Sequence, residues 1–219
     1  MIQLTHSSSV ISGSRKDLER LQAEFEEQHC IVLPALLDPG LLQLIQRQVD
    51  QAVFYKRIHE KGGNPPPVDF CMNSNEMAVT ILHLLVNEPG FFQFIQQVTG
   101  CGRIGCFAGS VYRLVPDQSS YDSWHDDIVS HRMVAMSLNL SREVYVGGVL
   151  QIRDWRSGEM VHEVANTGFG DAVIFRISPD LKHRVSSLEG TSARTAFAGW
   201  FLSQPDFRSV IKKDSPTLS

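Results

Sequence analysis

The sequence predicts one mostly β domain in which a strand-rich core, residues 101–205, follows a helical region, residues 16–100. Three observations predict this class. The length of 219 residues and the 42% hydrophobic content suit a single packed domain. Apolar residues recur at helical spacing up to residue 100. Short β-like runs separated by turn residues follow at steady intervals, which is typical of an antiparallel sandwich or barrel.

Four helices are expected in the first half of the chain. Their expected starts carry residues typical of a helix N-terminus: Asp17, Asp38 before Pro39, Asn73 with Glu76 three residues later, and Asn87 before Pro89. The second helix is expected to continue to about residue 58, and the fourth to end at Gly100. Residues 1–15 are rich in serine and are predicted to be poorly ordered. The Gly- and Pro-rich segment 60–70 is predicted to be a loop.

The second half of the chain carries the expected strands. A short apolar strand is also predicted earlier, at 31–33. The later strands are expected at 103–109, 110–115, 132–140, 145–152, 159–164, 171–177, 183–188 and 194–202, with a further extended segment around 124–127.

Charge and cysteine content exclude several classes of protein. A formal net charge of −4 offers no general basic surface, so a nucleic-acid partner is disfavoured. Four cysteines are too few for a disulfide framework. The N-terminus lacks the pattern of a signal peptide, and no apolar run is long enough to cross a membrane. We therefore expect a cytoplasmic protein with no membrane partner.

The strongest chemical signal is the motif Trp124-His125-Asp126-Asp127. In an extended segment, side chains alternate between faces, so His125 and Asp127 are expected to share one face. His183, at the start of a later β-like run, offers a third ligand. Two imidazoles and one carboxylate on one side of a metal leave the opposite positions open, as in non-haem Fe(II) oxygenases. An isolated His-x-Asp motif is also common on protein surfaces, so the later residues decide between the two interpretations.

Arg194 adds to the specificity of this pattern. It follows His183 across a Glu189-Gly190 turn, and a hairpin there would return its guanidinium toward the metal-binding end. A guanidinium can hold a carboxylate through two parallel hydrogen bonds, and a keto-diacid presents such a carboxylate. The alternative role for Arg194 is a cross-strand salt bridge.

Five motifs follow one another in the second half of the chain: VYRLVPDQSSYDSWHDD, MSLNLS, VGGVLQIRD, GDAVIFRISPDLKHRV and EGTSARTAFAGWF. In this order, they make the sequence resemble the 2-oxoglutarate- and Fe(II)-dependent oxygenase superfamily, in particular its prolyl-hydroxylase-like branch. The resemblance covers about residues 105–202. It implies a double-stranded β-helix, or jelly-roll, core with supporting helices.

The resemblance also implies roles for individual residues. His125, Asp127 and His183 would bind the iron, and Arg194 would bind the distal carboxylate of 2-oxoglutarate. Three further positions would line the cosubstrate pocket: Tyr112, Leu150 and Ser137, the last standing where some relatives have a tyrosine. Trp200 matches a family position near the active site, although an aromatic residue on a barrel strand is more often a core residue. No catalytic side chain beyond the metal ligands is expected.

The function implied by the resemblance is hydroxylation of an unactivated C–H bond in a peptide, an amino acid or a small metabolite. Fe(II), 2-oxoglutarate and O₂ would be required, ascorbate could support turnover, and 2-oxoglutarate would be decarboxylated to succinate. The carboxylate of Asp127 favours hydroxylation, because halogenating relatives leave this position to chloride. Three alternatives stay open: a cupin-like metal enzyme that does not use 2-oxoglutarate, a catalytically silent jelly-roll binding protein and, disfavoured by the acidic charge balance, nucleic-acid demethylation by a related branch.

Other histidines and arginines are weaker candidates. His131 and His162 lack an acidic partner two residues away and are interpreted as surface or loop residues. Four arginines could contact substrate but are expected to form salt bridges: Arg113, Arg132, Arg153 and Arg176. The substrate and the oligomeric state are not indicated by the sequence.

Overall fold

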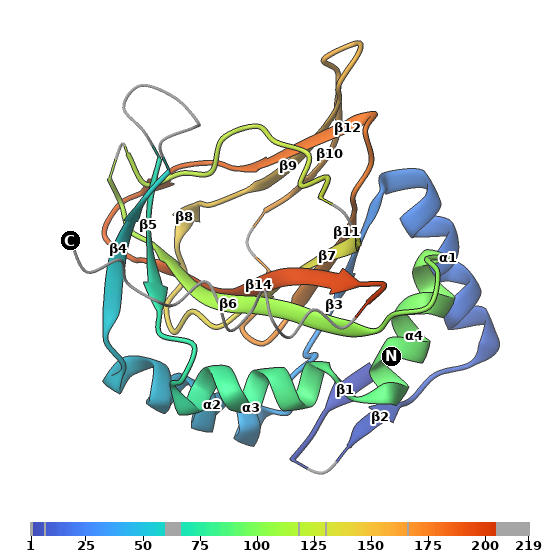
Figure 1. The fold of residues 1–219 in the computed structure, drawn as a ribbon, viewed down its shortest axis with the longest axis horizontal. Helices are drawn as coiled ribbons and strands as arrows, with labels where there is room; N and C mark the ends of the chain where they lie inside the picture. The colour runs from blue at the N-terminus through green and yellow to red at the C-terminus, as the bar shows by residue number, and fades with distance from the viewer. Residues whose placement is uncertain are drawn as a thin grey trace.

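Two antiparallel sheets face each other in the computed structural model (Figure 1). The structure describes residues 2–6, 8–59, 67–117, 119–129, 131–165 and 167–204. The large sheet has the order β3-β11-β7-β14-β6-β5-β4, and the small sheet has the order β10-β9-β12. The large sheet contains β3 (Cys30–Leu33), β4 (Phe54–Ile58), β5 (Val68–Met72), β6 (Cys106–Leu114), β7 (Arg132–Asn139), β11 (Ala172–Arg176) and β14 (Arg194–Leu202). The small sheet contains β9 (Leu150–Asp154), β10 (Met160–Val164) and β12 (Leu181–Val185), and a further pair joins β8 (Val146–Gly147) to β13 (Leu188–Glu189). The mostly β class with supporting helices is confirmed.

Four helices flank the large sheet: α1 (Arg15–Gln28), α2 (Pro39–Gln51), α3 (Met77–Val86) and α4 (Pro89–Thr99). In Figure 1, α2 and α3 lie along the face of the large sheet turned away from the small sheet, and α1 and α4 lie at one end. Among the described residues, no single helix is long and apolar enough to span a membrane. The consecutive pair α3 and α4, bent by 61°, meets that test only when taken together.

The alternation of side chains along β14 separates the core from the cavity described below. Phe197 and Phe201 are fully buried in the apolar core formed with the helices, and the Phe201 ring lies 5.9 Å from that of Phe91 in α4. Arg194, Ala198 and Trp200, at even positions, line the space between the two sheets. This period of two is the geometry of any β-strand, and it places polar and aromatic side chains between the sheets.

The second helix is shorter than the sequence predicted. It ends at Gln51, and Ala52 already has the extended backbone angles φ −81° and ψ 153°. The next residues form β4, which pairs antiparallel with β5, so a helix to residue 58 is wrong. Local apolar spacing could not reveal this pairing, because the partner strand begins at Val68, inside the segment predicted to be a loop, so the loop prediction is wrong for residues 68–70. Residues 60–66 of that loop lie outside the described residues.

Two predicted helix starts are also displaced. The N-cap residues are Glu76 for α3 and Glu88 for α4, and the Glu88 carboxylate accepts a hydrogen bond from the Phe91 backbone N–H. Asn87 ends α3 instead, and its side-chain oxygen accepts a hydrogen bond from the Phe107 backbone N–H at 2.8 Å. That contact ties the helix junction to β6.

The N-terminal segment is ordered, contrary to the prediction for residues 1–15. It forms a hairpin of β1 (Ile2–Leu4) and β2 (Ser9–Ile11), and α1 begins at Arg15. Leu4 is 1% exposed, and its backbone exchanges hydrogen bonds with Leu36 and Asp38. Serine content was a poor guide here, because two apolar side chains and pairing with a distant segment suffice to hold the hairpin.

The burial of Leu4 predicts how substitutions in the N-terminal hairpin change the stability of the protein. We expect Leu4→Ala to lower the free energy of unfolding by about 2 to 5 kcal/mol, because it leaves a cavity where a buried leucine was. Val10→Ala, at a side chain that is 47% exposed on the partner strand, should change it by less than about 0.5 kcal/mol. Urea denaturation of both variants measures the difference. Equal stability of the two would show that the hairpin does not contribute to the core.

Candidate metal centre and adjoining cavity

Backbone pairing brings the two candidate histidine ligands together. His125 and His183 form an antiparallel bridge, with N–H to carbonyl distances of 3.0 and 2.8 Å in the two directions. Their ring centroids are 4.2 Å apart. His183 belongs to β12, so the segment containing His125 runs beside the edge of the small sheet.

Asp127 completes the cluster through a turn, not through the extended alternation that the sequence predicted. Its φ is +58°, a left-handed conformation that aspartate tolerates better than most residues. The turn brings Asp127 Oδ2 to 3.2 Å from His183 Nε2 and 3.6 Å from His125 Nε2. One ligand atom from each of the three residues lies within 4.8 Å of the others. Asp126 points away and pairs with Lys182.

Both oxygens of the Asp127 carboxylate also accept hydrogen bonds from the large sheet. Arg132 Nη1 donates to Oδ1 at 2.9 Å, and Trp200 Nε1 donates to Oδ2 at 2.8 Å. On the other side of the cluster, His125 Nδ1 lies 2.6 Å from the Ser123 carbonyl oxygen. A backbone acceptor at Nδ1 leaves the opposite ring nitrogen, Nε2, free to bind a metal.

The cluster shifts the protonation of its members. Burial alone would lower the pKa of His125, but the contact with Asp127 and the negative charges of Asp122 and Asp127 outweigh burial and raise that pKa to about 9. Burial favours the neutral form of Asp127, yet the contacts with both histidines hold the pKa of Asp127 well below its usual range. The raised pKa favours the protonated form of His125 at neutral pH, with its positive charge beside the Asp127 carboxylate.

Metal affinity should follow this protonation. A metal ligand must be a neutral imidazole, so protons compete with the metal at every pH below the pKa of His125, which is about 9. We expect Co(II) affinity to rise about tenfold per pH unit between about pH 6 and pH 8, with about one proton released per ion bound. Titration calorimetry in buffers of different ionisation enthalpy measures both quantities. A pH-independent affinity would contradict the assignment of His125 as a ligand.

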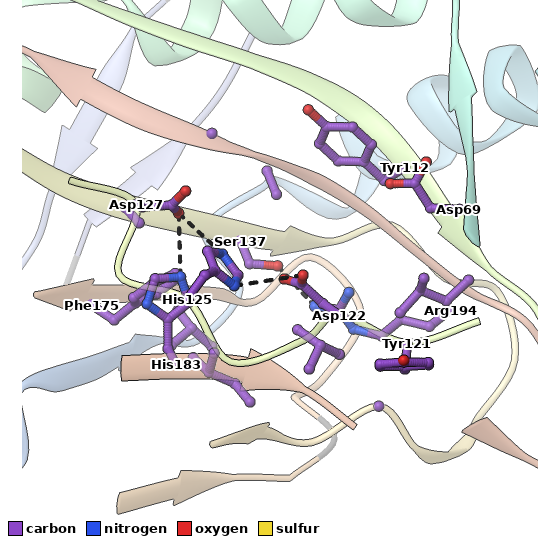
Figure 2. Close-up of a pocket in the computed structure, with 18 of the residues that line it drawn as sticks. Asp69, Tyr112, Tyr121, Asp122, His125, Asp127, Ser137, Phe175, His183 and Arg194 are labelled. Carbon is purple, nitrogen blue, oxygen red and sulfur yellow. Dashed lines mark hydrogen bonds and ion pairs between the residues drawn. The ribbon is translucent and has the colours of Figure 1, made fainter. Parts of the chain in front are cut away.

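The cluster forms one end of a cavity of about 390 Å³. Figure 2 shows His125, Asp127 and His183 together at one end and Arg194 at the other. Both sheets line it, the large one through Tyr112, Leu114, Ala135, Ser137, Val173, Phe175, Arg194 and Trp200, and the small one through Leu150, Val164, His183 and Val185. The residues proposed from the sequence for the metal and the cosubstrate therefore border one space.

Arg194 is positioned by a serine and a glycine. Its Nη2 donates to Ser137 Oγ at 2.9 Å, and among the described residues no carboxylate forms an ion pair with it. A Cβ at Gly148 would lie 2.9 Å from Arg194 Cδ, so the glycine leaves room for the arginine side chain. A guanidinium that borders a cavity without a carboxylate partner is available to an anionic ligand. The cross-strand salt bridge considered above is not found in the described part of the chain.

The other two predicted pocket residues differ in their surroundings. Leu150 is 7% exposed and borders the cavity from β9. Tyr112 also borders it, but the Arg57 guanidinium lies 4.6 Å from its ring centroid, and Asp69 pairs with that arginine. Burial raises the pKa of the Tyr112 hydroxyl.

The weaker candidates mostly lie elsewhere. Neither His131 nor His162 borders the cavity. Arg176 forms the expected salt bridge, with Glu26. Arg113 instead donates to Thr195, and Arg153 stacks on Trp124. Arg132 does form the salt bridge expected of it, but its partner is the candidate ligand Asp127.

Several polar residues of the cavity were not identified from the sequence. Tyr121 and Asp122 border it, and the Asp122 carboxylate lies 3.6 Å from His125 Nδ1. Their position directly before the His-x-Asp motif was a usable signal. Arg57 in β4, Asp69 in β5 and His59, directly after β4, also border it. The sequence predicted a helix at Arg57 and a loop at Asp69, so no signal pointed to these residues.

Known proteins resemble this chain in sequence over its core and in fold over nearly its full length. The sequence pattern of the 2OG-Fe(II) oxygenase superfamily matches residues 109–202. No curated protein matches the sequence.

Solved structures share the fold at low sequence identity. A 2OG-Fe(II) oxygenase family oxidoreductase from Burkholderia pseudomallei superimposes with a TM-score of 0.68 and 15% identity, covering 93% of this chain and 97% of that one. A prolyl hydroxylase from Trichoplax adhaerens, solved with a hypoxia-inducible-factor peptide, gives 0.64 and 14%, covering 93% and 98%. The epimerase SnoN, solved with Fe³⁺, α-ketoglutarate and nogalamycin RO, gives 0.62 and 14%, covering 94% and 93%.

The match over residues 109–202 includes the His-x-Asp motif, His183 and Arg194, and in the structure these residues all border one cavity. The sequence pattern and the fold agree: residues 109–202 are similar to the 2OG-Fe(II) oxygenase superfamily, and solved structures described as members of that family share the fold.

Proposed function

We propose that this protein is an Fe(II)- and 2-oxoglutarate-dependent oxygenase that hydroxylates an unactivated C–H bond. The observation that carries the proposal is the convergence of His125, Asp127 and His183 at one end of a cavity. At its other end lies Arg194, which forms no ion pair with a carboxylate of the described residues. We further propose that the two facing sheets form a double-stranded β-helix of the jelly-roll type.

The donor set fits Fe(II). Two imidazole nitrogens and one carboxylate oxygen within 4.8 Å of one another are the ligands of non-haem iron oxygenases, and they leave positions open on the metal. Bound iron would supply the activation of O₂, coupled to oxidative decarboxylation of 2-oxoglutarate to succinate and CO₂. The protein residues hold the ligands in place and exclude water, since His183 is only 5% exposed and its ring packs 4.8 Å from that of Phe175.

The cosubstrate would extend from the metal toward Arg194. The arginine would hold the distal carboxylate through charge-assisted hydrogen bonds, and Ser137 would fix the guanidinium through the contact it already makes. Leu150 would pack against the methylene carbons of the cosubstrate. Tyr112 would border the same pocket, although Arg57 already occupies one face of its ring.

The substrate would be a peptide or a small molecule. One structural neighbour was solved with a peptide and another with nogalamycin RO, so this fold accommodates both kinds of ligand. In this chain three polar residues of the β4–β5 region, Arg57, His59 and Asp69, border the cavity and would meet the substrate. Hydroxylation is proposed over epimerisation because it is the reaction implied by the prolyl-hydroxylase-like motifs.

Anaerobic titration tests the proposal. Protein free of metal is titrated with Fe(II) and then with 2-oxoglutarate, and a visible iron-to-ketoacid charge-transfer band is the expected result. Succinate release from candidate substrates, with ascorbate present, then identifies the substrate class. An iron-loaded, folded protein without the band would favour a cupin-like enzyme that does not use 2-oxoglutarate, and a protein that binds neither would favour a silent binding protein.

A further inference from the structure

Each oxygen of the Asp127 carboxylate accepts a hydrogen bond from a side chain of the large sheet. Oδ1 accepts from Arg132 at 2.9 Å and Oδ2 accepts from Trp200 at 2.8 Å. Oδ2 is also the oxygen that faces the imidazoles, at 3.2 Å from His183 Nε2 and 3.6 Å from His125 Nε2. The two oxygens therefore have different surroundings, and only one of them is directed toward the candidate metal position.

Arg132 and Trp200 also contact each other. The Arg132 guanidinium carbon lies 3.4 Å from the centroid of the Trp200 ring, a close cation–π contact. The two residues come from neighbouring strands, β7 and β14, whose register sets this stacking. Because each side chain restricts the other, a change at either one should disturb both hydrogen bonds to the carboxylate.

Arg132 further supports the turn that carries the ligand. Its Nη1 lies 3.4 Å from the Asp127 carbonyl oxygen, and its own backbone N–H donates to Val129 at 3.1 Å. Asp127 itself has a φ of +58°, a conformation that a side chain of this kind adopts at some energetic cost. With side chains 17% and 14% exposed, the Arg132–Asp127 pair is shielded more than an ordinary surface ion pair.

We propose that Arg132 and Trp200 are positioning residues that act as one unit and hold Asp127 to metal coordination through Oδ2 alone. Oδ2 is the oxygen that faces both imidazoles, and turning Oδ1 toward the same metal would disturb its ion pair with Arg132, so the arrangement favours coordination through Oδ2. Coordination through one oxygen keeps a further position on the metal open for other ligands. The inference rests on the proposed function, because it assumes that the cluster binds a divalent metal.

Co(II) binding by the metal-free protein tests this role without relying on turnover. Trp200→Phe keeps an aromatic ring and removes the N–H donor, while Arg132→Met keeps an aliphatic stem and removes the guanidinium. We expect each to weaken Co(II) binding by about tenfold or more and to alter the visible d–d absorption of the bound ion. Arg132→Lys, which restores a charged donor, should recover part of the affinity.

A double-mutant cycle tests whether the two residues act together. The variant carrying both Trp200→Phe and Arg132→Met should lose about as much affinity as the weaker-binding single variant, because either change disrupts the shared arrangement. Arg113→Met and Trp155→Phe are the matched controls. Arg113 stacks on Phe54 and Trp155 is 55% exposed, and neither borders the cavity. Both controls should bind Co(II) as the unchanged protein does.

The outcomes separate the inference from the function on which it rests. Folded Trp200→Phe and Arg132→Met variants with Co(II) affinity within twofold of the unchanged protein and an unaltered spectrum would overturn the positioning role. If the losses of Co(II) affinity in the two single variants add up in the double variant, the two residues act independently, and the proposal that they act as one unit is overturned. If either variant fails to fold, Arg132→Lys decides, because full affinity with an unaltered spectrum would leave the guanidinium without a role. Failure of the unchanged protein to bind Co(II) would instead overturn the proposed function.

Discussion

His183→Ala is expected to abolish the charge-transfer band that Fe(II) and 2-oxoglutarate produce in the unchanged protein. The substitution removes one of three ligands, and the affinity for Fe(II) should fall by more than about a hundredfold, beyond the loss typical for residues that only support a ligand. The backbone bridge between residues 125 and 183 needs no imidazole, so the segment carrying His125 should keep its place. Anaerobic absorbance titration measures the effect.

His162→Ala provides the matched control for this experiment. His162 also lies on a strand of the small sheet, but it does not border the cavity. This variant should give the band at unchanged Fe(II) and 2-oxoglutarate concentrations, and circular dichroism should show both variants folded. A band of full intensity in folded His183→Ala would remove His183 from the metal site.

Arg194→Met should separate the cosubstrate site from the metal site. The guanidinium borders the cavity with no carboxylate partner among the described residues, whereas Arg57, which also borders it, is paired with Asp69. Loss of two charge-assisted hydrogen bonds should raise the 2-oxoglutarate concentration needed for half of the band by about a hundredfold. Fe(II) affinity in the absence of 2-oxoglutarate should stay within about threefold of its original value, since Arg194 does not contact the metal cluster.

Arg113→Met is the matched control, because it removes an arginine from the strand next to the one that carries Arg194. Arg113 lies on β6 beside β14 and donates to Thr195, but it does not border the cavity. Its loss should leave the 2-oxoglutarate requirement unchanged. If Arg194→Met behaves in the same way, the distal carboxylate binds elsewhere and the proposed orientation of the cosubstrate is incorrect.

Much of the candidate site follows from the sequence because its chemistry is local. The His-x-Asp motif, a later histidine and an arginine on the next run are recognisable residue types at recognisable spacing. Their convergence follows from strand pairing, although a turn with positive φ at Asp127, not strand alternation, brings the carboxylate inward. The contacts of Arg132 and Trp200 were not predicted, because they depend on the register between β7 and β14.

The errors in the predicted elements have the same cause. The sequence of residues 54–58 continues the apolar spacing of the preceding helix, but these residues form a strand because β4 pairs with β5. The segment 2–11 looks unstructured by composition, but Leu4 pairs with the chain at 36–38 and is buried there. In both segments the deciding interaction joins residues ten or more positions apart, which local periodicity does not record.

The origin of the three ligands has a consequence for the motions of the protein. His183 belongs to the small sheet and His125 is bridged to it, while Asp127 is bound to the large sheet through Arg132 and Trp200. A metal ion bound to all three would cross-link the two layers at one end of the cavity only. Loading with metal should then slow amide hydrogen exchange in β12 far more than in β8 and β13, leaving the opposite end free to open for entering molecules.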